Sequence, residues 1–166
     1  MRFAPDTVQC RHATPLGRVH LAANPQGLCG LWFAGQKHAP TQLDGPQAWP
    51  EDAAHPLLRE ALRQLDAWFA GQLRAFDLPL DLSGGTPFQQ TVWNALLKLP
   101  WGQTENYGQL SARLGQPQAT RAVAAAVGRN PISLVVPCHR ILGARGQLTG
   151  YAGGLERKRA LLERER

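Results

Sequence analysis

Residues 107–127 read YGQLSARLGQPQATRAVAAAV, and this stretch decides how the second half of the chain folds. It predicts two short helices, Tyr107–Leu114 and Gln118–Val127, joined by the tight turn Gly115-Gln116-Pro117. Two brief helices around a glycine-containing turn are typical of a helix-turn-helix. The pattern is weak by itself, because many helical hairpins bind no nucleic acid.

The second of these helices carries almost only small side chains beside Arg121. Small residues allow close packing between helices, which is their commoner use. They also let a helix press into a DNA groove, where a lone arginine can enter the base stack as the wedge residues of minor-groove proteins do. Composition leaves both explanations open.

The segment Asp81-Leu82-Ser83-Gly84-Gly85 is the best candidate for a domain boundary. Thr86 follows it as a helix N-cap and Pro87 as the first helical residue. We therefore expect two domains, residues 1–82 and 83–166.

The first domain reads as strands followed by a helix. Strands are expected over Thr7–Ala13, over Val19–Ala23 and around residues 28–33, and a helix is expected to begin at Pro56 and end before Gly71. The predicted fold class is α+β: a small N-terminal antiparallel sheet with a helix, joined to a mainly helical domain with a short active-site strand.

The net charge of +6 is unevenly distributed. Residues 1–82 hold seven Lys and Arg against eight Asp and Glu, whereas residues 83–166 hold eleven against four. A basic second half favours a polyanionic partner, although a GC-rich codon bias toward arginine would produce the same asymmetry.

Three cysteines are too few for a disulfide framework or a four-thiolate zinc site. Such a sparse, odd number suits a reducing compartment, and no stretch has the length of a transmembrane helix or a signal-peptide core. We expect a cytoplasmic protein that does not contact membranes.

Cys138 lies in the most reactive context of the chain. The apolar, β-prone run 132–136 predicts a buried strand that ends at Pro137, and Cys138, His139 and Arg140 follow directly. A free thiol has a pKa of about 8.5 and loses its proton near neutrality only beside groups such as imidazole or guanidinium. The alternative is an inert buried cysteine, the reading we give to Cys10 and Cys29.

A carboxylate from the last helix can orient the imidazole. Leu155, Leu161 and Leu162 mark the buried face of a helix from residue 155 to about 164, and Glu165 follows on the same side. A buried carboxylate is costly unless it is paired, so we expect a contact between Glu165 and His139.

Together these residues resemble the O6-alkylguanine-DNA alkyltransferase family, also called methylated-DNA–protein-cysteine methyltransferases. The matching motifs run through residues 86–165 in order, and the N-terminal Pro15-Leu16-Gly17 turn fits loosely. They are Thr86-Pro87-Phe88-Gln89, Tyr107-Gly108, Arg121-Ala122-Val123, Asn130-Pro131, Pro137-Cys138-His139-Arg140 and Gly150-Tyr151, followed by residues 155–165.

The resemblance implies a ribonuclease H-like first domain and a single-turnover repair protein. It would flip O6-methylguanine, and O4-methylthymine, out of duplex DNA and transfer the alkyl group irreversibly to Cys138. His139 would take the thiol proton through a water, Glu165 would hold the imidazolium, and Asn130 would join the active-site network.

The other roles follow residue by residue from the resemblance. Arg121 matches the finger that fills the gap in the base stack, and Tyr107 matches the tyrosine that rotates the nucleotide. Further DNA contacts are implied for Thr120, Ala122, Ala124 and Arg129, and a substrate pocket for Val136, Pro137, Ile141, Tyr151, Ala152 and Gly153.

Three positions depart from the family pattern. Ala152 stands where some relatives have serine, with little expected loss because the contact there uses the backbone N–H. Asn106 replaces a common serine, with no effect that we can name. Cys29 lacks the partners of the zinc site found in some relatives, so we expect no metal and no cofactor.

Three other classes of protein share some of these features. A non-catalytic alkyltransferase-like protein would lack Cys138, a helix-turn-helix regulator would need a further domain, and a cysteine hydrolase would need local signatures that are absent. We expect a monomer without an obligatory protein partner. Few cations remain for phosphates (Lys98, Arg113 and Arg129), so the salt dependence of binding should be shallow.

Overall fold

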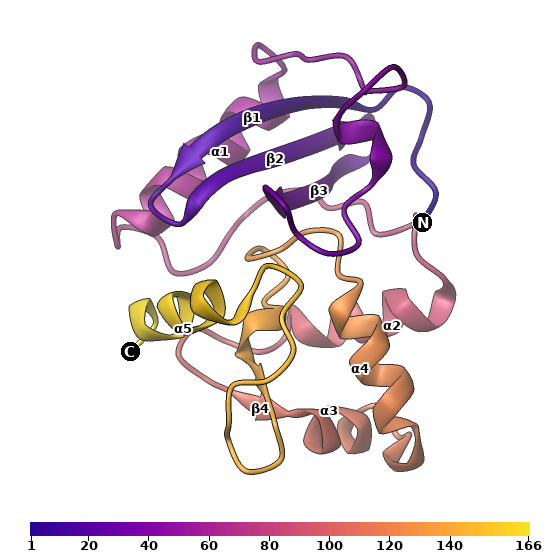
Figure 1. Ribbon diagram of the computed structural model, residues 1–166, viewed down its shortest axis with the longest axis vertical. Coiled ribbons are helices and arrows are strands. Elements are labelled where there is room, and N and C mark those ends of the chain that lie inside the picture. Colours follow the sequence, from indigo (N-terminus) through magenta and orange to yellow (C-terminus); the bar gives the residue numbers. More distant parts are fainter.

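A three-stranded antiparallel sheet forms the first part of the chain in the computed structural model, which describes residues 1–166 (Figure 1). Its strands are β1 (Val8–Thr14), β2 (Gly17–Asn24) and β3 (Gly27–Phe33), in that order across the sheet. The three predicted strands are confirmed. The turn between β1 and β2 needs glycine, because Gly17 has a φ of +105°.

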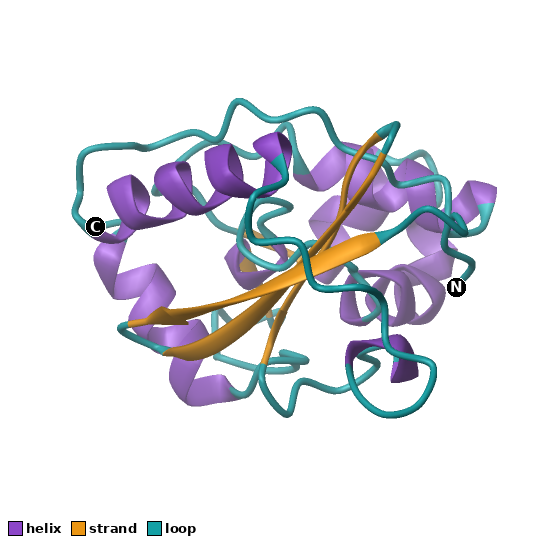
Figure 2. Cartoon of the chain, turned by 90° about the horizontal axis from the view of Figure 1, so that it is seen from above, coloured by secondary structure: helices purple, strands orange, loops and turns teal.

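Both faces of this sheet are covered over β3 and most of β2, whereas β1 is partly exposed. Helix α1 (Pro56–Phe69), predicted from Pro56 to Gly71, packs on one face, which Figure 2 shows from above. On the other face Trp32 packs with Trp49 and Phe3, which the loop after β3 and the N-terminal segment bring over the sheet. That loop has only the 3₁₀ turn Thr41–Leu43, as its proline and glycine content predicts.

Helices make up most of the second part. They are α2 (Pro87–Leu96), α3 (Tyr107–Arg113), α4 (Thr120–Gly128) and α5 (Leu155–Arg164). Thr86 caps α2 as predicted, in a capping box with Gln89. The parallel strands β4 (Glu105–Asn106) and β5 (Ile141–Leu142) are two residues each.

Helices α3 and α4 lie beside each other, joined by a tight turn and the 3₁₀ turn Pro117–Ala119. Gly115 adopts a φ of +71° at this turn. Trp93 of α2 donates a hydrogen bond from Nε1 to the Ala126 carbonyl, at 2.8 Å, so the small residues of α4 do serve packing on one side. On the other side Ala122 and Ala125 are exposed, so small side chains also line the solvent face of this helix.

The predicted strand 132–136 is wrong. Ile132 makes a single bridge to Leu31, after which the chain turns, with Leu134 at a φ of +73°. The Val136 N–H donates to the Ile132 carbonyl at 2.9 Å, so this apolar run closes on itself as a buried turn. Its hydrophobicity correctly predicted burial but carried no information about its hydrogen-bond partners.

One residue of the last helix also departs from expectation. Leu161 is fully buried and Leu162 half-buried, but Leu155 is 45% exposed at the first turn of α5. A buried lysine, Lys158, occupies the inner face there instead.

The two parts are joined by backbone hydrogen bonds. The Leu31 N–H donates to the Pro131 carbonyl, and the Ser133 N–H donates to the Leu31 carbonyl, each at 2.9 Å. The segment that leads to Cys138 is therefore attached to the edge of β3. Across the same junction, Arg164 of α5 donates to the Phe69 carbonyl at the end of α1.

Candidate active site

The Cys138 thiol lies in a 3₁₀ turn, Cys138–Arg140, directly after the buried turn. Its Sγ accepts a hydrogen bond from Nδ2 of Asn130 at 3.0 Å, and the same nitrogen donates to the Val136 carbonyl at 2.8 Å. Oδ1 of Asn130 accepts from the Ile132 N–H at 3.0 Å. One side chain thus holds both ends of the turn and the sulfur that it presents.

Burial raises the pKa of the Cys138 thiol above its usual range. The hydrogen bond from Asn130, the charge of Lys158 and the backbone N–H groups of Cys138 and His139 act in the opposite direction. The resting group is therefore a thiol, which must lose its proton before it can act as a nucleophile. The expectation that Arg140 stabilises a thiolate is wrong, because its guanidinium is bonded elsewhere.

His139 is fully buried beside Cys138, with Nε2 2.9 Å from Oε1 of Glu165. The carboxylate can only accept, so we assign the proton to Nε2. Nδ1 is then the basic nitrogen, and it has no hydrogen-bond partner in the protein. Burial lowers the pKa of His139 in spite of Glu165, so the ring is neutral at pH 7 and can accept a proton.

Glu165 is buried and held on both oxygens. Arg140 donates from Nε to Oε2 and from one terminal nitrogen to Oε1, both at 2.8 Å, and its other terminal nitrogen donates to the Leu99 carbonyl. Burial by itself raises the pKa of Glu165, but the hydrogen bonds from His139 and Arg140 prevail and lower it to about 2. The predicted contact with His139 is present, and His139 and Arg140 together keep the carboxylate ionised.

Lys158 is the functional candidate that the sequence analysis missed. It is fully buried, and its Nζ donates to the carbonyls of Ile141, Thr149 and Gly150. Burial lowers its pKa to about 8, while the neighbouring Cys138 opposes this. Its position three residues before Leu161, on the inner face of α5, was the available signal.

The segment 150–153 lies next to the thiol. The Tyr107 hydroxyl is 3.5 Å from the Gly150 carbonyl oxygen, and burial, followed by the nearby Cys138, raises the pKa of Tyr107. Burial raises the pKa of Tyr151 well above its usual value, and Cys138 contributes to that shift as well. Gly153 is required here, since a Cβ would lie 2.8 Å from the Tyr151 ring.

The remaining predicted pocket residues surround this place. Val136, Pro137 and Ile141 are buried on either side of the thiol, and the Ala152 carbonyl accepts a hydrogen bond from the Lys37 N–H at 3.0 Å. The predicted pocket residues therefore come from two stretches of the chain, 136–141, which includes Cys138, and 151–153.

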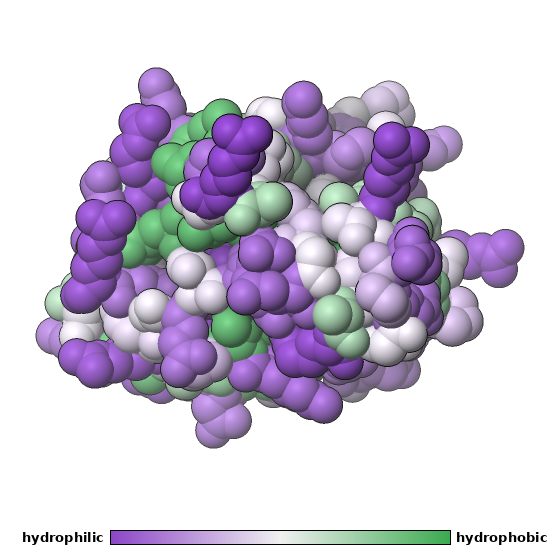
Figure 3. Space-filling model, turned by 90° about the horizontal axis from the view of Figure 1, so that it is seen from below, coloured by the Kyte–Doolittle hydropathy of each residue, from purple (hydrophilic) through white to green (hydrophobic).

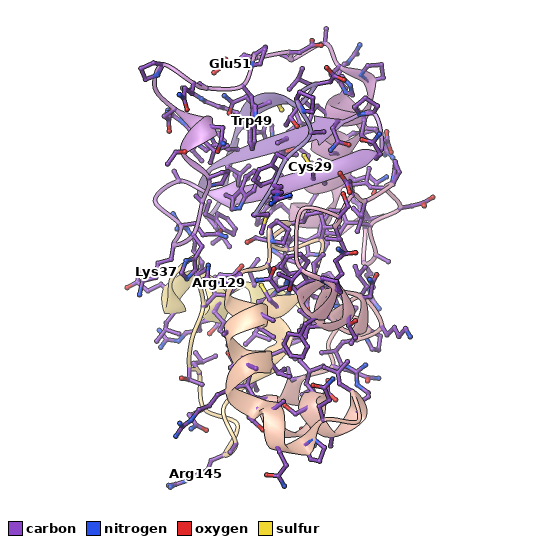
Figure 4. All side chains as sticks on the ribbon, turned by 90° about the vertical axis from the view of Figure 1, so that its right-hand side faces the viewer. Cys29, Lys37, Trp49, Glu51, Arg129 and Arg145 are labelled. Atoms are coloured by element: carbon purple, nitrogen blue, oxygen red, sulfur yellow. The ribbon has the colours of Figure 1, made fainter.

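Helix α4 presents Arg121 and Ala122 to solvent, with Thr120 and Ala124 half-buried. Viewed from below, this end of the molecule shows surface of intermediate hydropathy between long hydrophilic side chains (Figure 3). Arg129 is exposed at the end of α4 (Figure 4).

One of the three residues predicted to contact phosphates, Arg113, is already paired with another side chain. Arg113 makes a double hydrogen bond to Glu105, at 2.7 and 3.0 Å, and donates to the Ala95 carbonyl. Lys98 and Arg129 are exposed and make no ion pair.

The other cysteines lie away from this site. Burial raises the pKa of Cys10 to about 11 and that of Cys29 to about 12, and Cys29 lies within the sheet domain (Figure 4). No group of three metal-binding side chains occurs in the structure. No helix combines the length and the apolar character that a membrane crossing requires.

Comparison with known families gives two matches that together cover most of the chain. Residues 12–82 match the ribonuclease-like domain of 6-O-methylguanine DNA methyltransferase, and residues 87–166 match its DNA-binding domain.

Individual relatives agree. The chain is 47% identical over 161 residues to the methylated-DNA–protein-cysteine methyltransferase of Mycobacterium leprae, covering 96% of this chain and 93% of the relative. It is 45% identical over 152 residues to that of Methanosarcina acetivorans, covering 92% and 94%.

Solved structures show the same fold. The Mycobacterium tuberculosis OGT in complex with DNA has a TM-score of 0.87 at 45% identity, covering 95% of this chain and 92% of the other. The O6-methylguanine-DNA methyltransferase of Pyrococcus kodakaraensis has a TM-score of 0.62 at 26% identity, covering 96% and 98%.

Proposed function

The chain belongs to the 6-O-methylguanine DNA methyltransferase family, and we propose that it flips O6-methylguanine out of duplex DNA and transfers the methyl group irreversibly to Cys138. It is a DNA-binding repair methyltransferase of the methylated-DNA–protein-cysteine class. The observation that carries the proposal is the buried network in which Asn130 contacts Sγ of Cys138 while His139 keeps an unpartnered Nδ1 and is anchored by Glu165.

The first chemical step is removal of the thiol proton. Nδ1 of His139 accepts it, through one water, when the substrate fills the site. Glu165 stabilises the imidazolium that forms, and Arg140 keeps Glu165 ionised throughout. Asn130 and Lys158 stabilise the developing negative charge on sulfur.

Transfer then proceeds by displacement at the methyl carbon. A bond forms from Sγ to carbon as the bond from carbon to O6 breaks, and the electron pair moves onto the guanine oxygen. The proton taken from the thiol is returned to the guanine, so the atoms and charges balance. The product is an S-methylcysteine thioether that has no acidic proton, which limits each molecule to one turnover.

Binding and flipping are assigned to the helix-turn-helix. Thr120, Ala122 and Ala124 allow α4 to approach the minor groove, with Arg129 near its end. Arg121 would fill the gap left by the flipped nucleotide, and Tyr107 would help to rotate it. Unpairing costs a few kcal/mol and less for a mispaired lesion, so flipping itself favours damaged bases, O4-methylthymine included.

We assign the flipped base to the pocket formed by Val136, Pro137, Ile141, Tyr151, Ala152 and Gly153. We also propose residues 1–82 and 83–166 as the two domains, and a monomer as the active form. The short junction Asp81–Gly85 supports the division into two domains. The residues assigned to the thiol site all come from one chain, which supports a monomer.

Mass spectrometry after incubation with a duplex carrying one O6-methylguanine tests the proposal. The expected result is one added methyl group on Cys138, a ceiling of one methyl per protein, and a restored guanine. Turnover beyond one equivalent, or methylation of another residue, would contradict it.

Matched cysteine variants provide the control. Cys138→Ala should abolish transfer while binding to the duplex survives, and Cys29→Ala should retain full transfer because its thiol is buried in the other domain. Transfer of radiolabelled methyl to the Cys138→Ala protein would show that the nucleophile is misassigned.

A further inference from the structure

Glu165 is buried although it lies just outside a helix. It directly follows the last residue of α5, and its N–H donates to the Leu162 carbonyl at a long 3.3 Å. Helix ends fray readily, because their last backbone groups lack partners within the helix. His139 and Arg140 contact only the carboxylate oxygens of Glu165. Other groups must therefore hold the backbone that carries this side chain.

Arg164, the last residue of α5, attaches this helix end to the N-terminal domain. Its guanidinium donates to the Phe69 carbonyl at the end of α1 and lies over the rings of Trp68 and Phe69, 5.8 and 5.6 Å from their centroids. Helix α1 has no basic residue in its own last turn, where free carbonyls and the helix dipole favour a cation. Arg164 supplies that cation, and both helix ends lie on the left in Figure 1.

A second contact involves the backbone of Glu165 itself. Gly102 has a φ of +73°, and a Cβ there would lie 2.9 Å from the Glu165 carbonyl oxygen, so only glycine allows this close approach. The preceding residue, Trp101, packs against Trp68 with 5.5 Å between the ring centroids. Trp68 thus contacts Arg164 as well as Trp101, and the end of α1 supports both neighbours of the carboxylate.

We propose that Arg164 is a positioning residue for Glu165: by binding the end of α1 it keeps the carboxylate against His139, so the sheet domain supports proton transfer from Cys138. The role of Glu165 as partner of the imidazolium rests on the proposed function, whereas its anchoring by Arg164 does not. Arg164 acts only through Glu165. Its loss should therefore matter only while a carboxylate is present to be positioned.

A double-mutant cycle tests this dependence. Arg164→Gln should slow single-turnover methyl transfer from a duplex carrying one O6-methylguanine about fivefold, the effect of about one hydrogen bond. In a Glu165→Ala background the same substitution should cause no further loss, because the group that Arg164 positions is gone. Equal losses of rate in the two backgrounds would overturn the proposal.

Two matched substitutions separate anchoring from the loss of a charge. Arg164→Lys keeps a cation on a long side chain at the end of α1 and should retain most of the rate. Arg159→Gln removes the same charge from an exposed position on the same helix and should transfer methyl at the wild-type rate. A loss in Arg159→Gln as large as that in Arg164→Gln would show that net charge alone matters, and would overturn the anchoring role.

The imidazole of His139 provides a readout that needs no DNA. Its Nε2 proton is buried and bonded to Glu165, so in ¹⁵N-histidine-labelled protein it should exchange slowly with water. The chain has five histidines, and His139→Gln assigns the resonance. Arg164→Gln should accelerate this exchange about fivefold, because the end of α5 opens more often. Unchanged exchange would overturn the proposal.

A buried indole controls for general destabilisation in the same experiment. The Nε1 proton of Trp93 is bonded to the Ala126 carbonyl, within the second domain and away from α1. Its exchange should stay at the wild-type rate in Arg164→Gln. Equal acceleration at Trp93 and His139 would mean that the whole protein is less stable, and would contradict a specific anchor.

The two proposals fail in different ways. If wild-type protein transfers no methyl group, the proposed function fails, and exchange of the His139 proton still decides whether Arg164 anchors Glu165. If wild-type protein transfers methyl but Arg164→Gln changes neither the rate nor the exchange, only the anchoring is wrong.

Discussion

Nδ2 of Asn130 lies 3.0 Å from Sγ of Cys138, although eight residues separate them in the chain. The same side chain bonds the backbone of Ile132 and Val136, so the thiol is positioned and partly stabilised by one amide. A neutral donor of this kind stabilises the negative charge that develops on sulfur when the buried thiol loses its proton, and it does so without a permanent ion pair.

Asn130→Ala should therefore impair both stability and chemistry. Removal of the amide leaves the buried Ile132 N–H unpaired, at a cost of about 1–3 kcal/mol in the free energy of unfolding. The rate of methyl transfer should fall about tenfold or more, since the developing thiolate loses its closest donor. Urea unfolding and single-turnover kinetics measure the two effects.

Ser111→Ala, which removes a buried hydrogen bond to the Tyr107 carbonyl, is the control for a loss of stability. An equal loss of the methyl-transfer rate in that variant would argue against a special role for Asn130.

Glu165→Gln should change the response of stability to acid. The folded-state pKa of Glu165 is about 2, below its value of about 4.3 in an unfolded chain, so its contribution is present above pH 4.3 and is lost as the pH falls through 2. The difference corresponds to about 3 kcal/mol as an upper value. The unfolding free energies at pH 6 and pH 3 should therefore differ less in the variant than in the wild type. Glu163→Gln, exposed on the same helix, should behave as wild type.

Arg121→Ala should separate flipping from chemistry. We expect methyl transfer from a duplex to slow about tenfold or more, because the cavity in the base stack is left unfilled. Transfer from a free alkylguanine base, which needs no flipping, should be nearly unchanged. Equal losses on duplex and free base would remove the finger role from Arg121.

Arg129→Ala should reduce the salt dependence of DNA binding. Each phosphate contact contributes roughly −0.9 to the slope of log K against log salt. Arg113→Ala should leave the slope unchanged, because this guanidinium is committed to Glu105. Binding isotherms at several salt concentrations distinguish them, and a smaller slope in the Arg113 variant would show that the ion pair opens on DNA.

The sequence was a good guide wherever one residue type decides local structure. Pro56 and the Thr86–Pro87 pair begin helices α1 and α2 as predicted, because capping and proline preferences act over one turn. It failed at 132–136, where the same apolar composition serves a strand or a buried turn. The choice there was made by Asn130 and by the edge of β3, neither of which a local pattern includes.

By itself, then, the sequence predicted the N-terminal strands and the main helices, the two-part organisation, the reactive box at Cys138 and the inward position of Glu165. Only the tertiary structure decided the partners: Arg140 bonds Glu165 and not the thiol, Lys158 is buried beside Cys138, and Gln36 reaches Ser133 from 97 residues away. The physical reason is that helical and turn preferences are set by neighbours within a few residues. A buried charge or hydroxyl is instead stabilised by whichever group the fold brings within about 3 Å of it.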